Sequence, residues 1–229
     1  MHMIVSTLVF GLLAHVVGLP SRSKRAVCKV ARMWCRMLLW MAGAKVEATI
    51  TEPLDPDRPY VFVSNHMSHL DVPSLFVTLN RQLSFMAKRS LMFVPIFGTG
   101  MYSVGVVIVN RKKKKQARAS VDYAAQQVAK GRSVFVFAEG GRSRDGRIGE
   151  FKKGAFILAI KAQVPLVPVR IEGSRDILPR GSISPRPGTI RVTVFPPIST
   201  DGLTVDDRDM LLQKALDNII GGDTGNGIG

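Results

Sequence analysis

The sequence predicts an α/β fold, in which a mixed and largely parallel sheet is covered by helices. Short apolar runs rich in Val, Ile and Phe are typical of buried strands, and they alternate along the chain with segments of helical periodicity. Strands separated by helices favour parallel pairing, because each crossover returns the chain to the same edge of the sheet. The chain has 229 residues, which is enough for one sizeable core.

The individual elements are expected after Gly43. The predicted strands are residues 60–64, 83–87, 106–110, 133–137, 166–171 and 190–195. The predicted helices are residues 71–79, 116–130, 153–162 and 205–220. The first of these helices should begin close to Asp71, because Pro73 is tolerated only in the first turn of a helix.

The first apolar stretch, residues 3–19, contains no Lys, Arg, Asp or Glu and is followed by Pro20. As a helix it is about 26 Å long, slightly short of a hydrocarbon core of about 30 Å. The basic segment after Pro20 does not resemble a signal-peptide cleavage site. We therefore expect residues 3–19 to embed in a membrane and to remain on the protein.

The next helix, residues 23–41, is predicted to be amphipathic. Its basic stripe and its boundary tryptophan are expected to contact an anionic membrane, through Arg22, Arg25, Lys29, Arg32, Arg36 and Trp34. The opposite face is apolar, as in a helix that lies in the membrane interface. The alternative is a core helix with a solvated charged face.

The balance of charge is strongly basic, with 32 Lys and Arg against 17 Asp and Glu and a formal net charge of +15. Such a chain attracts phosphate-bearing partners, which include nucleic acid, anionic lipid and nucleotides. The glycines near position 100 do not form a dinucleotide fingerprint and no P-loop is present, which excludes nucleotide hydrolysis. Cys28 and Cys35 are about 10 Å apart along the predicted helix, too far for a disulfide, and they indicate a reducing compartment.

His66 follows the strand predicted at residues 60–64 and precedes a carboxylate, Asp71. An imidazole oriented by a carboxylate can take a proton from a hydroxyl near neutral pH. We therefore interpret His66 as a general base and Asp71 as its orienting acid. Alternatively, Ser68 or Asp71 serves only to cap the next helix. His69 is expected to be a solvated or packed loop residue.

A second polar cluster follows the strand predicted at residues 133–137. It contains Glu139, two adjacent glycines, Arg142 and Ser143. The glycines permit a sharp turn at the end of a strand, where open α/β sheets bind ligands. Arg142 has the planar fork that suits a phosphate. The alternative is an ordinary glycine turn with solvated charges.

Four groups of residues between Asn65 and Val169 carry a resemblance to a known family. They are the NHxSxxD pattern of Asn65, His66, Ser68 and Asp71; a block comprising Lys88, Ser90, Leu91, Pro95, Gly98, Gly105 and Arg111; the set Phe137, Glu139, Gly140, Arg142 and Ser143; and residues 164–169, VPLVPV. In this order they resemble the motifs of the glycerolipid acyltransferases. The departures are Ala138 and Gly141, where the family more often has proline and threonine, and they affect loop shape more than charge.

The resemblance implies an acyl transfer from a thioester, acyl-CoA or acyl carrier protein, to the sn-2 hydroxyl of lysophosphatidate. It implies substrate-binding roles for Lys88, Arg111, Glu139, Gly140, Arg142 and Ser143. Among these, the arginines are expected to hold the acceptor phosphate, and Glu139 to bond a glycerol hydroxyl or a neighbouring arginine. No cofactor and no metal site are expected.

The expected reaction is direct and gives phosphatidate for phospholipid biosynthesis. Neither cysteine lies near the motifs and no serine stands in a nucleophile elbow, so no covalent acyl-enzyme is proposed. Another lysolipid remains open as the acceptor. A non-catalytic basic module that binds anionic membrane or nucleic acid is the alternative of a different class. It leaves the ordered motifs unexplained, so no nucleic-acid partner is expected.

The chain is therefore divided into a helical membrane anchor at residues 1–43, an acyltransferase catalytic domain at residues 44–220 and a flexible tail at residues 221–229. Basic residues flank the apolar segment 3–19 on its C-terminal side. We accordingly expect a monotopic protein of the inner, cytoplasmic membrane, with its catalytic domain facing the cytoplasm.

Overall fold

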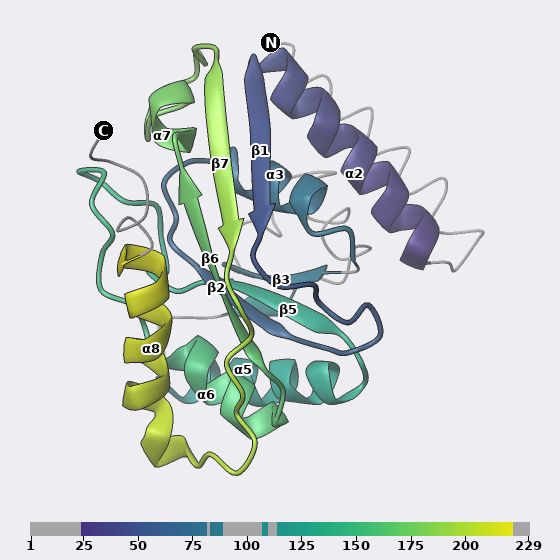
Figure 1. Ribbon diagram of the computed structural model, residues 1–229, viewed down its shortest axis with the longest axis vertical. Coiled ribbons are helices and arrows are strands. Elements are labelled where there is room, and N and C mark those ends of the chain that lie inside the picture. Colours follow the sequence, from purple (N-terminus) through teal and green to yellow (C-terminus); the bar gives the residue numbers. More distant parts are fainter. Residues whose placement is uncertain (1–23, 82, 89–106, 110–113, 222–229) are drawn as a thin grey trace.

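The computed structural model describes residues 24–81, 83–88, 107–109 and 114–221. Within these residues seven strands form one sheet, in the order β1-β7-β6-β2-β5-β3-β4 (Figure 1). The strands are β1 (Ala44–Ile50), β2 (Val61–Ser64), β3 (Leu83–Lys88), β4 (Val107–Val109), β5 (Ser133–Phe137), β6 (Leu166–Glu172) and β7 (Gly188–Val194). All neighbours are parallel except β6 and β7. The predicted mixed, largely parallel α/β fold is confirmed.

Helices cover both faces of the sheet. On one face lie α2 (Lys24–Met41), α3 (Asp71–Thr78) and the short α7 (Ser174–Ile177). On the other lie α5 (Lys114–Ala129), α6 (Gly154–Ala162) and α8 (Arg208–Gly221), the last preceded by a 3-10 turn at Val205–Asp207. Figure 1 shows α5, α6 and α8 grouped together, away from α2 and α3.

The central strand β2 contributes to both hydrophobic cores. Phe62 faces the core beneath α2 and α3, whereas Val61 and Val63 face the core beneath α5, α6 and α8. Successive side chains of a strand point to opposite faces, so a parallel strand covered on both faces is a nearly continuous apolar run. Every residue of β2 is buried. The strand therefore provides a rigid base for the loop that follows it.

The apolar side of α2 packs on the protein, contrary to the prediction that it lies in a bilayer. Cys35 and Leu39 are buried in the same core as α3, and Trp34 packs against that core. Arg32, predicted to lie among lipid head groups, donates from Nε to the Phe76 carbonyl oxygen of α3 at 3.1 Å. The helix follows the alternative reading in this respect, because its apolar face covers α3 and the β1 edge of the sheet.

The predicted elements after Gly43 are found within a few residues of their expected bounds, and β1 and α7 were not predicted. Cys28 and Cys35 are free thiols, as expected. Among the described residues, no helix has the length and apolar character needed to cross a membrane. The expectations for residues 3–19, Arg22, the Arg25 side chain and the tail from residue 222 lie outside the described part of the chain.

Candidate active site

His66 lies directly beyond the carboxyl end of β2, the edge at which open α/β sheets bind ligands. Its Nδ1 atom is 2.8 Å from Oδ2 of Asp71. The imidazole also stacks on Phe137 at the end of β5, with ring centroids 3.9 Å apart and planes inclined by 18°. The side chain of His66 remains 16% exposed while that of Asp71 is fully buried. The ring is thus held firmly but stays accessible.

The hydrogen bonds of Asp71 define the tautomer of His66. Oδ2 of Asp71 accepts the backbone N–H groups of Met67 at 2.7 Å and Ser68 at 2.9 Å. A carboxylate oxygen can only accept hydrogen bonds, so the hydrogen between Asp71 and His66 lies on Nδ1. Nε2 is then left with a free lone pair that can accept a proton. The geometry fits the predicted base and orienting acid.

The carboxylate of Asp71 lies in the first turn of α3, where the helix dipole favours negative charge. The capping alternative predicted that Asp71 would satisfy orphan amides of this helix. The residue before the helix, Leu70, makes no side-chain cap bond, although its N–H donates to Ser68 Oγ at 3.3 Å, and Asp71 accepts hydrogen bonds from the loop before it. Its hydrogen bonds therefore serve the loop that carries His66.

Two polar side chains fasten this loop to β6 and to the segment after it. Nδ2 of Asn65 donates to the Ile171 carbonyl at 2.8 Å, and the Ile171 N–H donates to Oδ1 of Asn65 at 2.9 Å. The amide thereby extends the β2–β6 pairing beyond Ser64. Oγ of Ser68 donates to the carbonyl of Leu178 at 2.8 Å. Both ends of the His66 loop are consequently fixed.

Glu139, predicted to contact the acceptor, is occupied by backbone groups. Oε1 accepts the N–H of His66 at 2.7 Å, and Oε2 accepts the N–H of Gly149 at 2.9 Å. The next residue, Gly140, has a φ of +75°, a conformation that glycine adopts without strain. The sharp turn allows the chain to reverse after β5. Glu139 is thus placed as a brace between loops.

Ser143, also predicted to bind substrate, is buried within its own turn. Its Oγ donates to the Arg147 carbonyl at 2.8 Å and accepts the Gly146 N–H at 2.9 Å. The backbone N–H of Ser143 donates to the carbonyl of His66 at 2.8 Å. The structure thus gives Ser143 a part in shaping the site and in holding His66.

A hollow of about 420 Å³ lies beside these loops. Its lining residues are Glu139, Gly140, Gly141, Arg142, Arg144, Gly149, Glu150, Lys152 and Arg180. Desolvation and the neighbouring charge of Arg180 lower the pKa of Arg142, while Asp71 acts in the opposite direction. Arg142 directly precedes Ser143, whose N–H bonds the His66 carbonyl, so the loop that carries Arg142 lies against the His66 loop. Desolvation and the charges of Arg142 and His66 lower the pKa of His69, which is exposed, in line with the solvated one of its two expected readings.

Two further predicted residues are only partly described or not described. Lys88 ends β3, two strands away from β2 in the sheet, and its side chain lies outside the described residues. Arg111 also lies outside them. Sequence reasoning missed Arg180, which belongs to none of the four motifs. Only the fold brings it to Arg142.

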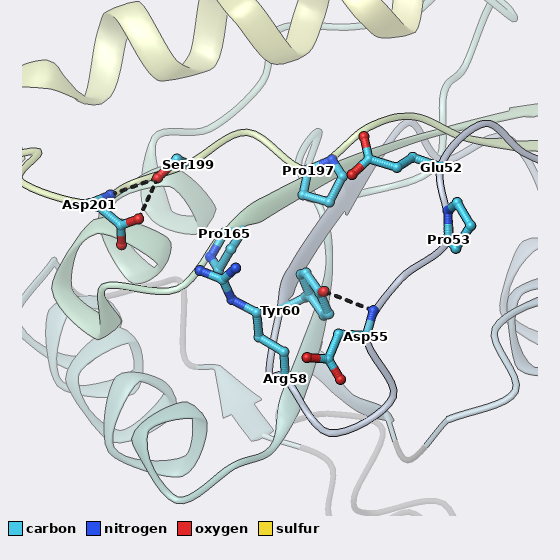
Figure 2. A pocket seen from close by; sticks show the side chains of 9 residues that line it. All are labelled: Glu52, Pro53, Asp55, Arg58, Tyr60, Pro165, Pro197, Ser199 and Asp201. Carbon is cyan, nitrogen blue, oxygen red and sulfur yellow. Dashed lines mark hydrogen bonds between the residues drawn. The ribbon is translucent and has the colours of Figure 1, made fainter.

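A second hollow, of about 360 Å³, lies at the opposite end of the central strands, near the amino ends of β2 and β6 (Figure 2). Figure 2 shows Tyr60 and Pro165 in its lining, and these residues precede β2 and β6. Tyr60 is six residues before His66, or about 20 Å along an extended strand. Ser199 and Asp201 bond each other there, and Tyr60 Oη accepts the Asp55 N–H. The His66 site is separate from this hollow.

The described residues contain no group of three or more His, Cys, Asp and Glu side chains able to hold a metal ion. The site instead combines an oriented imidazole with a basic hollow, as suits an enzyme that deprotonates a hydroxyl on an anionic substrate. The chain belongs to the Acyltransferase family, whose sequence profile matches residues 45–172.

Curated proteins of similar sequence are named as 1-acyl-sn-glycerol-3-phosphate acyltransferases. The chain is 32% identical over 193 residues to human 1-acyl-sn-glycerol-3-phosphate acyltransferase alpha, covering 84% of this chain and 68% of that protein. It is 41% identical over 171 residues to the chloroplastic enzyme of that name, BAT2, from Brassica napus, covering 74% of this chain and 49% of that protein.

The fold also matches a crystal structure, that of the 1-acyl-sn-glycerophosphate acyltransferase PlsC from Thermotoga maritima. The TM-score is 0.82 at 22% identity, and the match covers 98% of this chain and 93% of that one. At this identity the likeness concerns the fold.

Proposed function

We propose that this protein is a 1-acyl-sn-glycerol-3-phosphate acyltransferase. It moves a fatty acyl group from a thioester, acyl-CoA or acyl carrier protein, to the sn-2 hydroxyl of lysophosphatidate, and phosphatidate is the product. The observation that carries the proposal is the hydrogen bond from His66 Nδ1 to the buried Asp71, beside a hollow that contains Arg142. The names of the curated relatives support the same reaction.

Proton transfer to His66 begins the reaction. Nε2 removes the proton of the sn-2 hydroxyl as the oxygen attacks the thioester carbonyl carbon. Asp71 stabilises the imidazolium that forms. Collapse of the tetrahedral intermediate breaks the carbon–sulfur bond, and the thiolate takes the proton from His66. The ester and the free thiol leave, and the enzyme returns to its starting state without a covalent intermediate.

Positioning of the acceptor is assigned to the basic hollow. The guanidinium of Arg142 binds the acceptor phosphate, and Lys88 and Arg111 are proposed to assist it. Fixing the phosphate fixes the glycerol backbone, which brings the reacting hydroxyl to a defined place. Glu139 and Ser143 are proposed to position the base relative to the acceptor, since each hydrogen-bonds the backbone of His66.

The enzyme is proposed to work at an anionic membrane surface through the exposed face of α2. Lys29, Met33, Arg36 and Trp40 are all exposed, at the spacing of one helical stripe. Trp40 is 80% exposed, and a tryptophan beside basic groups is typical of the membrane interface. Residues 1–43 thus form the proposed anchor of a monotopic protein of the inner membrane, with its catalytic domain in the cytoplasm.

The active site, at the carboxyl end of β2, lies at the same end of the sheet as the C-terminus of α2. The Gly43 carbonyl, just after the helix, accepts the Gly188 N–H, and Pro187 packs against Gly43. The segment that leads to Pro187 carries Ile183, which is 93% exposed. Its exposed apolar tip supports an orientation in which this end of the sheet meets the bilayer.

The reaction is tested by supplying detergent-dispersed enzyme with a panel of lysolipids and with both kinds of acyl donor, and by following loss of the thioester. We expect the highest kcat/KM with lysophosphatidate. A higher value with another lysolipid would reassign the acceptor. Failure of every acceptor to consume thioester would contradict the enzymatic function.

The membrane contact is tested by co-sedimentation of the full chain with vesicles containing anionic lipid. A triple variant, K29Q/R36Q/W40A, should bind at least tenfold more weakly, since each basic side chain near the surface contributes about 1 kcal/mol. The matched control is R118Q/K130Q/Y123A, which alters exposed residues on or just after α5, at the opposite face of the sheet. Equal binding by both triple variants would contradict this surface.

A further inference from the structure

We propose that Arg180 is a second phosphate-binding guanidinium, which makes the acceptor site select a phosphate monoester over a phosphodiester. The inference rests on the proposed acyl transfer and names the feature of the acceptor that the site recognises. A lysophosphatidate has a monoester head group, whereas lysolipids that carry a further head-group alcohol are diesters.

Arg180 reaches the site from the segment between α7 and β7. Its Nη1 donates to the carbonyl oxygen of Arg142 at 2.9 Å, across 38 residues of sequence. Both arginines line the same hollow. A guanidinium has five N–H donors, so this single bond leaves Arg180 with donors available for a ligand while it fixes the side chain beside Arg142.

The charges around the hollow favour a doubly charged ligand. Its lining has four basic side chains and two acidic ones. Glu150 is paired with Lys152 at 2.9 Å, and Glu139 accepts two backbone N–H groups. The remaining arginines repel one another, which is consistent with the effect of Arg180 in lowering the pKa of Arg142. A ligand with two negative charges relieves this repulsion more than a ligand with one.

The two classes of lysolipid differ in the charge of the phosphate group and in the number of its terminal oxygens. A phosphate monoester carries a charge of about −1.5 to −2 near neutral pH and presents three terminal oxygens. A phosphodiester carries a single charge and presents two non-bridging oxygens. Two guanidinium forks can both find oxygens on a monoester, whereas one fork nearly saturates a diester.

The test compares the intact wild-type enzyme with Arg180→Gln, using lysophosphatidate as the monoester and lysophosphatidylglycerol as the diester. We expect Arg180→Gln to raise the KM for lysophosphatidate roughly tenfold, as for the loss of a charge-assisted contact, and to change that for the diester less than about twofold. The donor KM should be unchanged. The KM of Arg180→Lys for lysophosphatidate should lie between those of wild type and Arg180→Gln, because lysine keeps the charge without the fork.

The matched control is Arg186→Gln, which alters an exposed arginine of the same segment that does not line the hollow. It should resemble wild type with both acceptors. An unchanged KM for lysophosphatidate in Arg180→Gln, or an equal rise for both acceptors, overturns the proposal, the latter because it indicates a role only in holding the Arg142 loop. Absence of transfer by wild type to either acceptor would instead refute the proposed function.

Discussion

The backbone N–H of His66 donates to Oε1 of Glu139 at 2.7 Å, and this bond joins the loops that follow β2 and β5. The two strands are parallel neighbours, with Ser64 opposite Phe137. A second bond in the opposite sense, from the Ser143 N–H to the His66 carbonyl, completes the connection. The loop that presents Arg142 is therefore the loop that holds the proposed base. The proposed acceptor-binding residue and the proposed base therefore belong to one rigid unit.

The brace formed by Glu139 predicts a particular response to Glu139→Gln. The amide can accept one of the two backbone N–H groups, but its NH₂ then faces the other donor. We expect stability to fall by about 1 kcal/mol, a value reduced for partial exposure, together with a lower kcat. Urea denaturation and steady-state kinetics measure both quantities. If stability is unchanged and only the KM for the acceptor rises, Glu139 contacts the acceptor directly, as the sequence predicted.

The buried Asp71 predicts that Asp71→Asn loses most of its activity. The amide oxygen can still accept the backbone N–H groups of Met67 and Ser68, but a neutral amide cannot stabilise the imidazolium as a carboxylate does. We expect kcat to fall by a factor on the order of 10² to 10⁴. The exposed Asp57→Asn serves as the control and should match wild type. Wild-type turnover by a folded Asp71→Asn would show that the carboxylate does not orient the base.

The position of Arg142 in the hollow predicts a selective effect of Arg142→Lys. Lysine keeps the charge but loses the bidentate fork. The KM for lysophosphatidate should rise by roughly tenfold, while the KM for the thioester donor changes little. Arg58→Lys, in the hollow of Figure 2 at the other end of the central strands, should leave both constants unchanged. Equal increases in both constants for Arg142→Lys would assign the arginine to general folding of the loop.

The sequence predicted the central part of the site because parallel strands end at one edge. Apart from one serine each, the strands before His66 and Glu139 are apolar, as is typical of strands covered on both faces. Once both are placed in one parallel sheet, the loops after them meet. The resemblance then indicated which side chains are candidates for the chemistry.

Other features depended on long-range packing. Arg180 lies in a segment without a motif, and only the fold brings it to Arg142. The apolar face of α2 satisfies the same periodicity whether a bilayer or α3 covers it, and the burial of Cys35 and Leu39 in one core with Leu75 of α3 shows that α3 does. Strand β1 was missed, although Ala44–Ile50 alternates apolar and polar residues, a signal that could have found it.

The central claim is that His66 is the general base, and the initial rate of His66→Ala with lysophosphatidate and an acyl thioester tests it most directly. The His69→Ala variant, at an exposed position three residues away, is the control. We expect His66→Ala to lose at least about 100-fold in kcat with an unchanged melting temperature, and His69→Ala to retain most of its activity. Retention of more than about a tenth of wild-type turnover by His66→Ala would mean that another group removes the proton, because general base catalysis contributes more than that.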